Sequence, residues 1–178
     1  VRGRDLMPVF TPISHEQLVA DVLAIAAAIH ADRDWKPDFI IGIGRGGLSP
    51  AVYLSHATGM PMLSVDPSPQ AHDFAEAPLE RLAERTRAGE KLLFLDDIND
   101  SGATIAKLRA KLAAAGATPG AVRFATLLDN ATSSQRVEYA ARAIDRTVIK
   151  DWFVFPWEAV APAASIAADA AEMPDRIA

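Results

Sequence analysis

The chain has 178 residues, half of them hydrophobic, and a formal net charge of -5 at neutral pH. A chain of this length can bury a core of its own, and an acidic protein without a basic run is a poor candidate for binding nucleic acid. The sequence contains no cysteine, which excludes disulfides and thiolate metal sites.

The sequence predicts a single domain over residues 1–178, without internal repeats or linkers. No run reaches the roughly 20 apolar residues that a membrane span needs, and no signal-peptide pattern is visible, so we expect a cytoplasmic protein. If Met7 is the native start, residues 1–6 do not belong to the natural protein.

Short apolar runs alternate with helical patterns along the chain. A capping-box pattern at Ser14 opens the first helix, and Gly59 and Gly116 close two later ones. The expected helices span residues 14–30, 49–58 and 104–115, and the expected strands span 39–43, 61–65, 91–95 and 122–128, with a further strand within 144–155. This alternation predicts the α/β class, with a mostly parallel sheet and helices on both faces.

Residues 66–90 interrupt the alternation with a polar stretch punctuated by prolines, although Leu79 to Arg87 has the composition of a charged helix. A long excursion between two buried strands is often functional. We therefore predict a mobile active-site loop over residues 66–90. Arg81, Arg85 and Arg87 are its candidate charged side chains, and the sequence does not choose among them.

Two junctions between a strand and a helix carry the residues best suited to chemistry. In open α/β sheets, ligands bind at the carboxyl ends of the strands. The first junction, IIGIGRGGLSP, spans residues 40–50. Its glycines let the backbone approach a ligand closely, and Arg45 supplies a planar guanidinium suited to phosphate. Taken alone, the glycine run is equally typical of an ordinary tight turn.

The second junction, DDINDSGAT, spans residues 96–104 and follows a buried strand. Its clustered carboxylates repel one another unless a cation or a polyol lies between them. Asp96 and Asp97 can accept hydrogen bonds from vicinal hydroxyls or bind Mg²⁺, while Ser101, Thr104 and the helix-start amides can hold an anion. Together the junctions suit a phosphorylated sugar that carries pyrophosphate. Alternatively, the two acids only cap the helix that follows.

The motif Asp-Asp-x-x-Asp-Ser-Gly-x-Thr after a strand resembles the phosphoribosyl pyrophosphate signature of the type I phosphoribosyltransferases. The GRGG turn is similar to their pyrophosphate loop, and DWFVFPWE at 151–158 resembles the base-binding end of the xanthine-guanine group of 6-oxopurine phosphoribosyltransferases. The three blocks occur in the family's order and span residues 39–158. The resemblance implies the type I phosphoribosyltransferase fold with a small C-terminal base-binding hood.

The same resemblance implies Mg²⁺-dependent transfer of the 5-phosphoribosyl group from phosphoribosyl pyrophosphate to a nucleobase such as guanine, xanthine or hypoxanthine. It places the ribose hydroxyls and Mg²⁺ on Asp96 and Asp97, and makes Asp100 the general base. The 5′-phosphate would be held by Asp100, Ser101, Gly102, Ala103 and Thr104, and pyrophosphate by Gly44, Arg45, Gly46 and Gly47, with Arg45 stabilising the leaving group. It also implies a cis peptide between Gly44 and Arg45.

For the nucleobase, the resemblance implies that Trp152 stacks on the ring, that the Phe153 backbone reads its edge and that Glu158 meets its exocyclic group. Trp152 and Trp157 are alternatively packing aromatics, and Glu158 is alternatively a solvated acid. The partners implied are phosphoribosyl pyrophosphate and a nucleobase, in a homodimer or homotetramer.

The sequence departs from the 6-oxopurine enzymes where they usually carry a lysine that donates to the purine O6. Asp129 or Asn130 occupies that stretch here, and Lys150 is the other candidate. Asn99 has no evident role. A regulatory module that binds nucleotide without turnover, or a phosphoribosyltransferase for a different base such as a pyrimidine, therefore remains an alternative.

Overall fold

A parallel sheet of five strands forms the centre of the protein, in a computed structural model that describes residues 9–66 and 72–171. The strands lie in the order β3-β2-β4-β5-β6, and every neighbouring pair is parallel. Their bounds are β2 (Phe39–Ile43), β3 (Met62–Val65), β4 (Leu92–Asn99), β5 (Val122–Asn130) and β6 (Tyr139–Ile144). The carboxyl ends of all five strands therefore meet along one edge of the sheet, where α/β proteins bind ligands.

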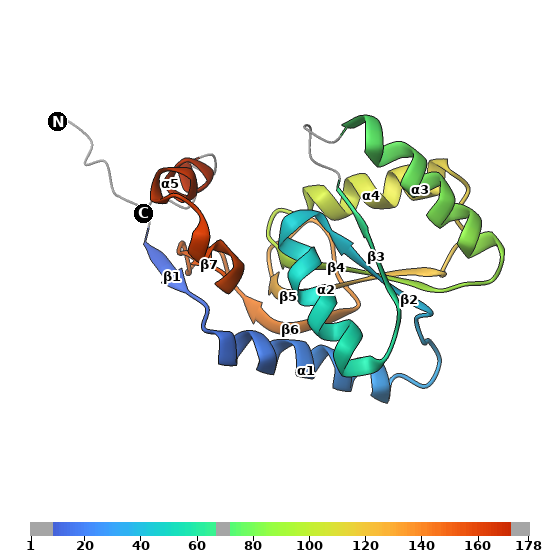
Figure 1. The fold of residues 1–178 in the computed structure, drawn as a ribbon, viewed down its shortest axis with the longest axis horizontal. Coiled ribbons are helices and arrows are strands. Elements are labelled where there is room, and N and C mark those ends of the chain that lie inside the picture. Colours follow the sequence, from blue (N-terminus) through green and yellow to red (C-terminus); the bar gives the residue numbers. More distant parts are fainter. Residues whose placement is uncertain (1–8, 67–71, 172–178) are drawn as a thin grey trace.

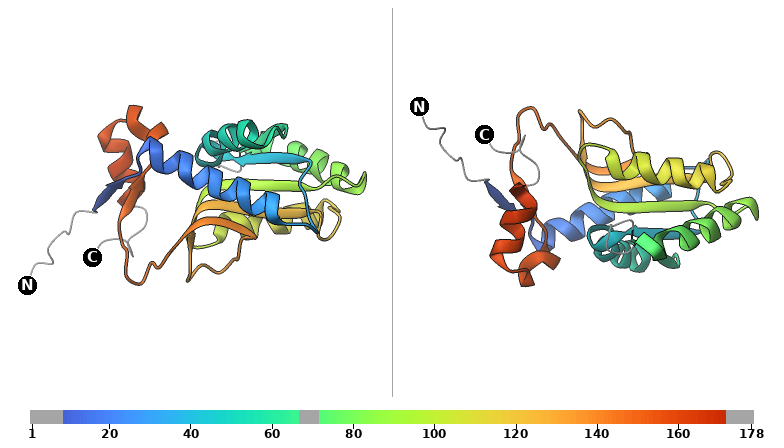
Figure 2. Two further views of the ribbon diagram at one scale, coloured as in Figure 1. Left: turned by 90° about the horizontal axis from the view of Figure 1, so that it is seen from below. Right: turned by 90° about the horizontal axis from the view of Figure 1, so that it is seen from above.

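Helices cover both faces of this sheet, as the sequence predicts (Figures 1 and 2). They are α1 (His15–Ala31), α2 (Gly44–Thr58), α3 (His72–Arg87) and α4 (Ala103–Ala114). Leu93 and Leu95 of β4 join the core cluster of α1 and α2, whereas Leu92 and Phe94 join the cluster of α3 and α4. Alternate residues of β4 thus pack into the cores on opposite faces of the sheet, which explains why the strand is a continuous apolar run.

The two described ends of the chain meet in a small unit beside the main sheet, which we call the hood (Figure 1). Its strands β1 (Phe10–Pro12) and β7 (Trp152–Val154) form a separate parallel pair. The 3₁₀ helix η2 (Pro156–Val160) and the helix α5 (Ala163–Ala171) follow β7. Buried Phe155 stacks on Trp157 at 4.7 Å and belongs to the core of α1 and α2, which anchors the hood to the sheet.

Two predicted boundaries at the ligand-binding edge are wrong. β4 runs to Asn99 rather than ending at Leu95, because its pairing with β5 continues through Ile98 and Asn99. α2 begins at Gly44 rather than near Ser49, so the GRGG turn is the first turn of a helix and not a loop. In both places tertiary pairing and packing outweigh the local preferences of aspartate and glycine.

Residues 66–90 contain α3, whose C-terminal half matches the charged helix predicted over 79–87. Leu79 and Leu82 of α3 are buried against α4 and the sheet. The predicted loop over residues 66–90 is therefore wrong for residues 72–87, which are a packed helix, while residues 67–71 lie outside the described residues. Two of its candidate arginines are engaged at the amino-terminal edge of the sheet, since Arg85 pairs with Glu90 and Arg87 donates to the Ala115 and Gly116 carbonyls. None of the helices described is both long and apolar enough to cross a membrane.

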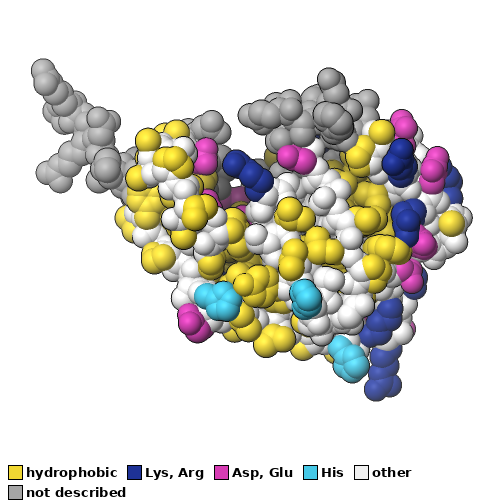
Figure 3. Space-filling view, in the orientation of Figure 1, with side chains coloured by type: hydrophobic (Ala, Val, Ile, Leu, Met, Phe, Trp, Pro, Cys, Tyr) yellow, Lys and Arg dark blue, Asp and Glu magenta, His cyan; other side chains and the backbone are white. Residues whose placement is uncertain are grey.

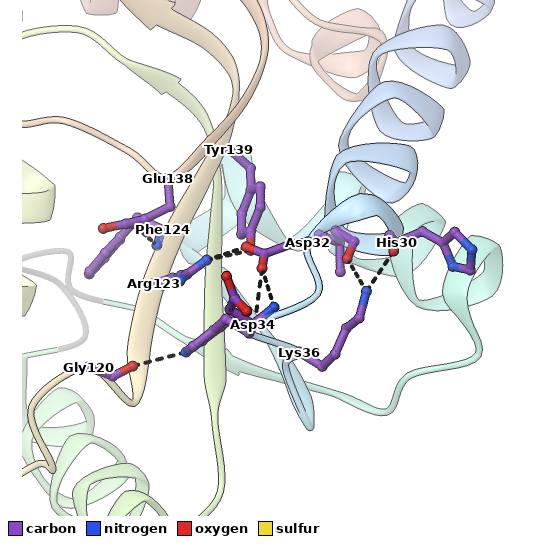
Figure 4. A network of polar contacts seen from close by, with 11 residues as sticks. His30, Asp32, Asp34, Lys36, Gly120, Arg123, Phe124, Glu138 and Tyr139 are labelled. Atoms are coloured by element: carbon purple, nitrogen blue, oxygen red, sulfur yellow. Dashed lines mark hydrogen bonds and ion pairs between the residues drawn. The ribbon is translucent and has the colours of Figure 1, made fainter.

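A polar network ties the amino-terminal edge of the sheet together, opposite the ligand-binding edge (Figure 4). Asp32, which follows α1, accepts hydrogen bonds from Arg123 Nη1 at 2.6 Å and Tyr139 Oη at 2.7 Å. The Arg123 guanidinium also lies 4.6 Å from the centre of the Trp35 ring. These contacts join the end of α1 to the first residues of β5 and β6.

Candidate active site

Asp96 and Asp97 occupy the carboxyl-terminal half of β4 and are partly buried. Burial, together with the nearby negative charge of Glu158, raises the pKa of Asp97 to about 6, although a hydrogen bond from the Ile98 amide opposes this shift. Burial and then the charge of Asp97 raise the pKa of Asp96 well above its ordinary value. A cation placed beside this pair would favour the ionised form of both carboxyls.

The first turn of α2 packs directly against these acids. A Cβ added to Gly46 would lie 2.5 Å from Asp97 Oδ2, and one added to Gly47 would lie 2.1 Å from the Leu95 carbonyl oxygen. Only glycine permits so close an approach. Gly44 begins the helix with φ 54, and the peptide that links it to exposed Arg45 is trans, so the predicted cis peptide is wrong. The structure thereby brings Gly46 and Gly47 to the acidic pair.

A pocket of about 240 Å³ is lined by residues 96–105. Its far wall is the start of α4, where Gly102 adopts φ 88 and Ala103 opens the helix. Ser101 Oγ accepts a hydrogen bond from the Ala103 amide at 3.3 Å, and Thr104 is exposed. Because the first amides of a helix have no partner within it, this wall favours a bound anion.

Asn99, for which the sequence offers no role, links β4 by hydrogen bonds to the end of β5 and to the connection between β5 and β6. Its Nδ2 donates to Asp129 Oδ1 at 2.7 Å and to the Gln135 carbonyl at 2.8 Å, and its Oδ1 accepts from Ser133 Oγ at 3.0 Å. The side chain is 2% exposed. Asn99 is therefore a structural residue in the wall of the pocket, and the Asp129 carboxylate accepts a hydrogen bond from it.

Asp100 forms an ion pair that the sequence does not predict. Its Oδ2 lies 3.1 Å from Nη2 of Arg146, a buried residue between β6 and β7. Burial lowers the pKa of the Arg146 guanidinium, although an arginine remains charged in proteins. No spacing signal connects two residues so far apart in the chain, so the sequence alone could not have paired them.

The candidates for the missing purine-reading lysine lie in different surroundings. Asn130 is buried, and its Nδ2 donates to the Asp100 carbonyl at 3.0 Å. Lys150 lies close enough to Asp145 for its charge to help lower the pKa of that carboxyl, after two hydrogen bonds from Thr147. Asn130 thus supports the Asp100 backbone.

The predicted base-binding residues lie in the hood. Trp152 and Phe153 are in β7 and are partly exposed, and Trp152 pairs with Phe10 of β1. Glu158 Oε2 accepts a hydrogen bond from the Phe155 amide at 2.8 Å, which caps η2. The negative charge of Glu158 also helps to raise the pKa of Asp97, so the hood acts electrostatically on the acidic pair.

An acidic pair and the first turns of two helices, α2 and α4, thus meet at the carboxyl end of one parallel strand. The family model of the phosphoribosyl transferase domain matches residues 13–162. The chain therefore belongs to the phosphoribosyl transferase family, and the protein is a phosphoribosyltransferase, as its sequence motifs suggest.

Solved structures share the fold. A purine phosphoribosyltransferase from Pyrococcus horikoshii is 25% identical with a TM-score of 0.60, over 83% of this chain and 93% of that chain. A xanthine-guanine-hypoxanthine phosphoribosyltransferase from Helicobacter pylori is 16% identical with a TM-score of 0.61, over 84% and 94%. A Neisseria gonorrhoeae protein solved with bound ppGpp is 19% identical with a TM-score of 0.63, over 94% and 98%.

Proposed function

We propose that this phosphoribosyltransferase moves the 5-phosphoribosyl group from phosphoribosyl pyrophosphate to a 6-oxopurine, such as guanine, xanthine or hypoxanthine. The observation that carries the proposal is the meeting of Asp97, Gly46 and the start of α4 around one strand end. The likeness to the Pyrococcus horikoshii purine phosphoribosyltransferase supports a purine as the acceptor.

In this reaction a ring nitrogen of the base forms a bond to C1 of the sugar while the bond from C1 to pyrophosphate breaks. Asp96 and Asp97 hold the ribose hydroxyls, since carboxylates accept the hydrogen bonds that a vicinal diol donates. The 5′-phosphate lies in the pocket of residues 96–105, held by the amides and hydroxyls of Asp100, Ser101, Gly102, Ala103 and Thr104. Asp100 accepts the proton that the base releases.

Mg²⁺ is the metal that suits this donor set. Within residues 9–66 and 72–171, no cluster of three or more His, Cys, Asp or Glu side chains could hold a metal ion. Mg²⁺ is usually bound by one or two carboxylates together with water and substrate phosphates, which matches the pair Asp97 and Asp96. When bound, the ion offsets negative charge that develops on pyrophosphate. The raised pKa values of both carboxyls support this fit, because each gains from a nearby cation.

Pyrophosphate lies at the first turn of α2, on the amides of Gly44, Gly46 and Gly47 and on the guanidinium of Arg45. Arg45 is exposed, so its side chain can fold over an entering anion. The partial positive charge at the start of α2 favours the same group.

The base lies between the pocket and the hood. Trp152 stacks on its ring, the Phe153 backbone reads its edge, and Glu158 meets its exocyclic group through the carboxylate oxygen that η2 leaves available. Lys150 is a weaker candidate for base binding. Stacking of a base on an aromatic side chain contributes about 1–3 kcal/mol, enough to fix the orientation of the base.

A panel assay tests the proposal. The protein is incubated with Mg²⁺, phosphoribosyl pyrophosphate and, one at a time, guanine, xanthine, hypoxanthine, adenine, uracil and orotate, and nucleotide and pyrophosphate are measured. We expect nucleotide from at least one 6-oxopurine and none without Mg²⁺. A pyrimidine as the best acceptor would replace the purine assignment, and no product from any base would refute the proposed reaction.

We also propose a homodimer or homotetramer. Leu48 and Val52 on α2 and Leu63 on β3 are each about two-fifths exposed, at 40%, 41% and 39%. Figure 3 shows apolar side chains gathered over the face that carries α2. Light scattering on the eluting protein measures the assembly, and a Leu48→Glu variant that elutes as the wild type would show that this face is not the contact.

A further inference from the structure

Asp100 and Arg146 are joined through their side chains by a forked contact. Arg146 Nε lies 3.2 Å from both carboxylate oxygens of Asp100, and Nη2 lies 3.1 Å from Oδ2. The two residues are far apart in sequence, one beside the pocket and the other between β6 and β7. The side chain of Arg146 is 9% exposed and that of Asp100 is 15% exposed, so the contact is shielded from water.

The backbones of the same two residues are joined independently through Asn130. Its Nδ2 donates to the Asp100 carbonyl at 3.0 Å, and its Oδ1 accepts from the Arg146 amide at 3.1 Å. Asn130 is 4% exposed and ends β5. Because one amide side chain binds both backbones, Asn130 fixes the distance between the Asp100 and Arg146 main chains.

The other side of the Arg146 guanidinium contacts the segment that leads into the hood. Nη1 donates to the Asp151 carbonyl at 2.6 Å and to the Ile149 carbonyl at 3.3 Å. The guanidinium also lies 5.1 Å from the centre of the Phe153 ring. One side chain therefore reaches from the phosphoribosyl pocket to the proposed base-binding residues.

Burying a guanidinium is costly unless its donors are satisfied, and a buried ion pair is a weak source of net stability. The contacts instead suit a role in fixing the position of the Asp100 carboxylate relative to residues 149–151, for which a guanidinium is well suited. Its planar fork can serve a carboxylate on one side and carbonyls on another, whereas the single ammonium of lysine cannot span both.

We propose that Arg146 is a positioning residue that holds the carboxylate of Asp100 at a fixed place relative to residues 149–153. Arg146 thereby fixes the phosphoribosyl site and the base site relative to each other. This inference rests on the proposed function, because it assumes that a nucleobase binds between Asp100 and the hood.

The variants are Arg146→Gln, which removes the charge, and Arg146→Lys, which keeps it but loses the fork. The matched control is Arg142→Gln. Arg142 forms a comparable pair with buried Asp21 of α1, at 2.8 Å between Nη2 and Oδ2, and touches none of the proposed site residues. Loss of stability alone would therefore affect the control as well.

Three quantities are measured for each variant: amide hydrogen exchange in peptides spanning residues 99–105 and 147–154, the dissociation constant for GMP, and kcat and KM with the best base. For Arg146→Gln we expect faster exchange in both peptides, at least tenfold weaker GMP binding and at least a tenfold lower kcat. Arg146→Lys should recover part of kcat, while its KM for the base should remain above that of the wild type. Arg142→Gln should match the wild type in all three quantities.

Unchanged kinetic constants in Arg146→Gln, or equal losses in Arg142→Gln, would overturn the inference. If the wild type turns over no base, the proposed function fails, and exchange and GMP binding then decide on Arg146. Faster exchange in both peptides with weaker GMP binding would support the positioning role, and unchanged values would overturn it.

Discussion

Gly46 in the first turn of α2 lies so close to Asp97 of β4 that no side chain fits between them, since a Cβ at Gly46 would be 2.5 Å from Asp97 Oδ2. Gly46 does not have a positive φ, so its lack of a side chain and not its conformational freedom is what the contact requires. The start of α2 therefore packs directly on the end of β4, and this contact would place the proposed pyrophosphate and ribose sites side by side.

Gly46→Ala should displace the Asp97 carboxylate. Overpacking of this kind costs about 1–3 kcal/mol of unfolding free energy. We also expect KM for phosphoribosyl pyrophosphate to rise by at least about tenfold, equivalent to about 1.4 kcal/mol of binding. Urea unfolding and steady-state kinetics measure both. His56→Gln, in the exposed last turn of the same helix, is the control and should change neither. Wild-type KM in Gly46→Ala would show that the contact does not position Asp97.

Asp97→Asn should impair turnover, because the amide keeps the size of the carboxylate but loses its charge. Removing one preorganised electrostatic contact to a transition state typically lowers kcat by about 10²–10³-fold, and we expect a loss in that range. Steady-state kinetics with saturating Mg²⁺ measures it, and circular dichroism shows whether the fold is kept. A folded variant with wild-type kcat and KM would remove Asp97 from the site.

Asn99→Ala should destabilise the protein without removing any group that contacts substrate. The change leaves Ser133 Oγ and Asp129 Oδ1 without their hydrogen bonds to Asn99. Leaving a buried polar group unsatisfied costs about 1–3 kcal/mol, which urea unfolding can measure. Asn99→Asp should cost more at neutral pH, because it sets a second carboxylate against Asp129. If the unfolding free energies of both variants lie within about 0.5 kcal/mol of the wild-type value, Asn99 does not stabilise the fold in the way that its contacts indicate.

The network at Asp32 predicts a pH dependence of stability (Figure 4). Hydrogen bonds from the Tyr139 hydroxyl and then from Arg123 hold the pKa of Asp32 far below its usual range. An acid with a lowered pKa contributes stability above its unfolded-state pKa of about 3.9, and that stability is lost as the pH falls below this value. Asp32→Asn should therefore be less stable than the wild type at pH 7.

The difference in unfolding free energy between Asp32→Asn and the wild type should shrink steadily as the pH is lowered from 5 to 2. Urea unfolding at several pH values measures it. Asp34→Asn, two residues further along the same turn, serves as the control, because the exposed Asp34 carboxylate accepts no hydrogen bond from the described residues. A gap that stays constant with pH would contradict the assignment of the ion pair.

The sequence was most informative where a local pattern coincides with a strand end. The apolar run before Asp96 predicts the buried strand, and the acids after it predict the ligand-binding edge, because both follow from residues adjacent in the chain. The same holds for the first helix, whose N-cap Ser14 accepts a hydrogen bond from the Gln17 amide at 3.1 Å, as its capping box predicts.

Contacts between distant residues could not be predicted from the sequence. Arg146 meets Asp100 only because the parallel strands β4, β5 and β6 bring the residues that follow β4 and those that follow β6 to the same edge of the sheet. β6 was missed because its half-exposed sequence YAARAI lacks the continuous apolar run of the central strands. The early start of α2 at Gly44 was missed because glycine is a poor helix former, and only packing on β4 explains it.

The central claim is that the phosphoribosyl group binds at the carboxyl end of β4, and a crystal structure with bound GMP tests it most directly. We expect the 5′-phosphate on the amides of residues 101–104 and the ribose hydroxyls on Asp96 and Asp97. A nucleotide bound elsewhere, with the pocket of residues 96–105 empty of phosphate, would contradict the account.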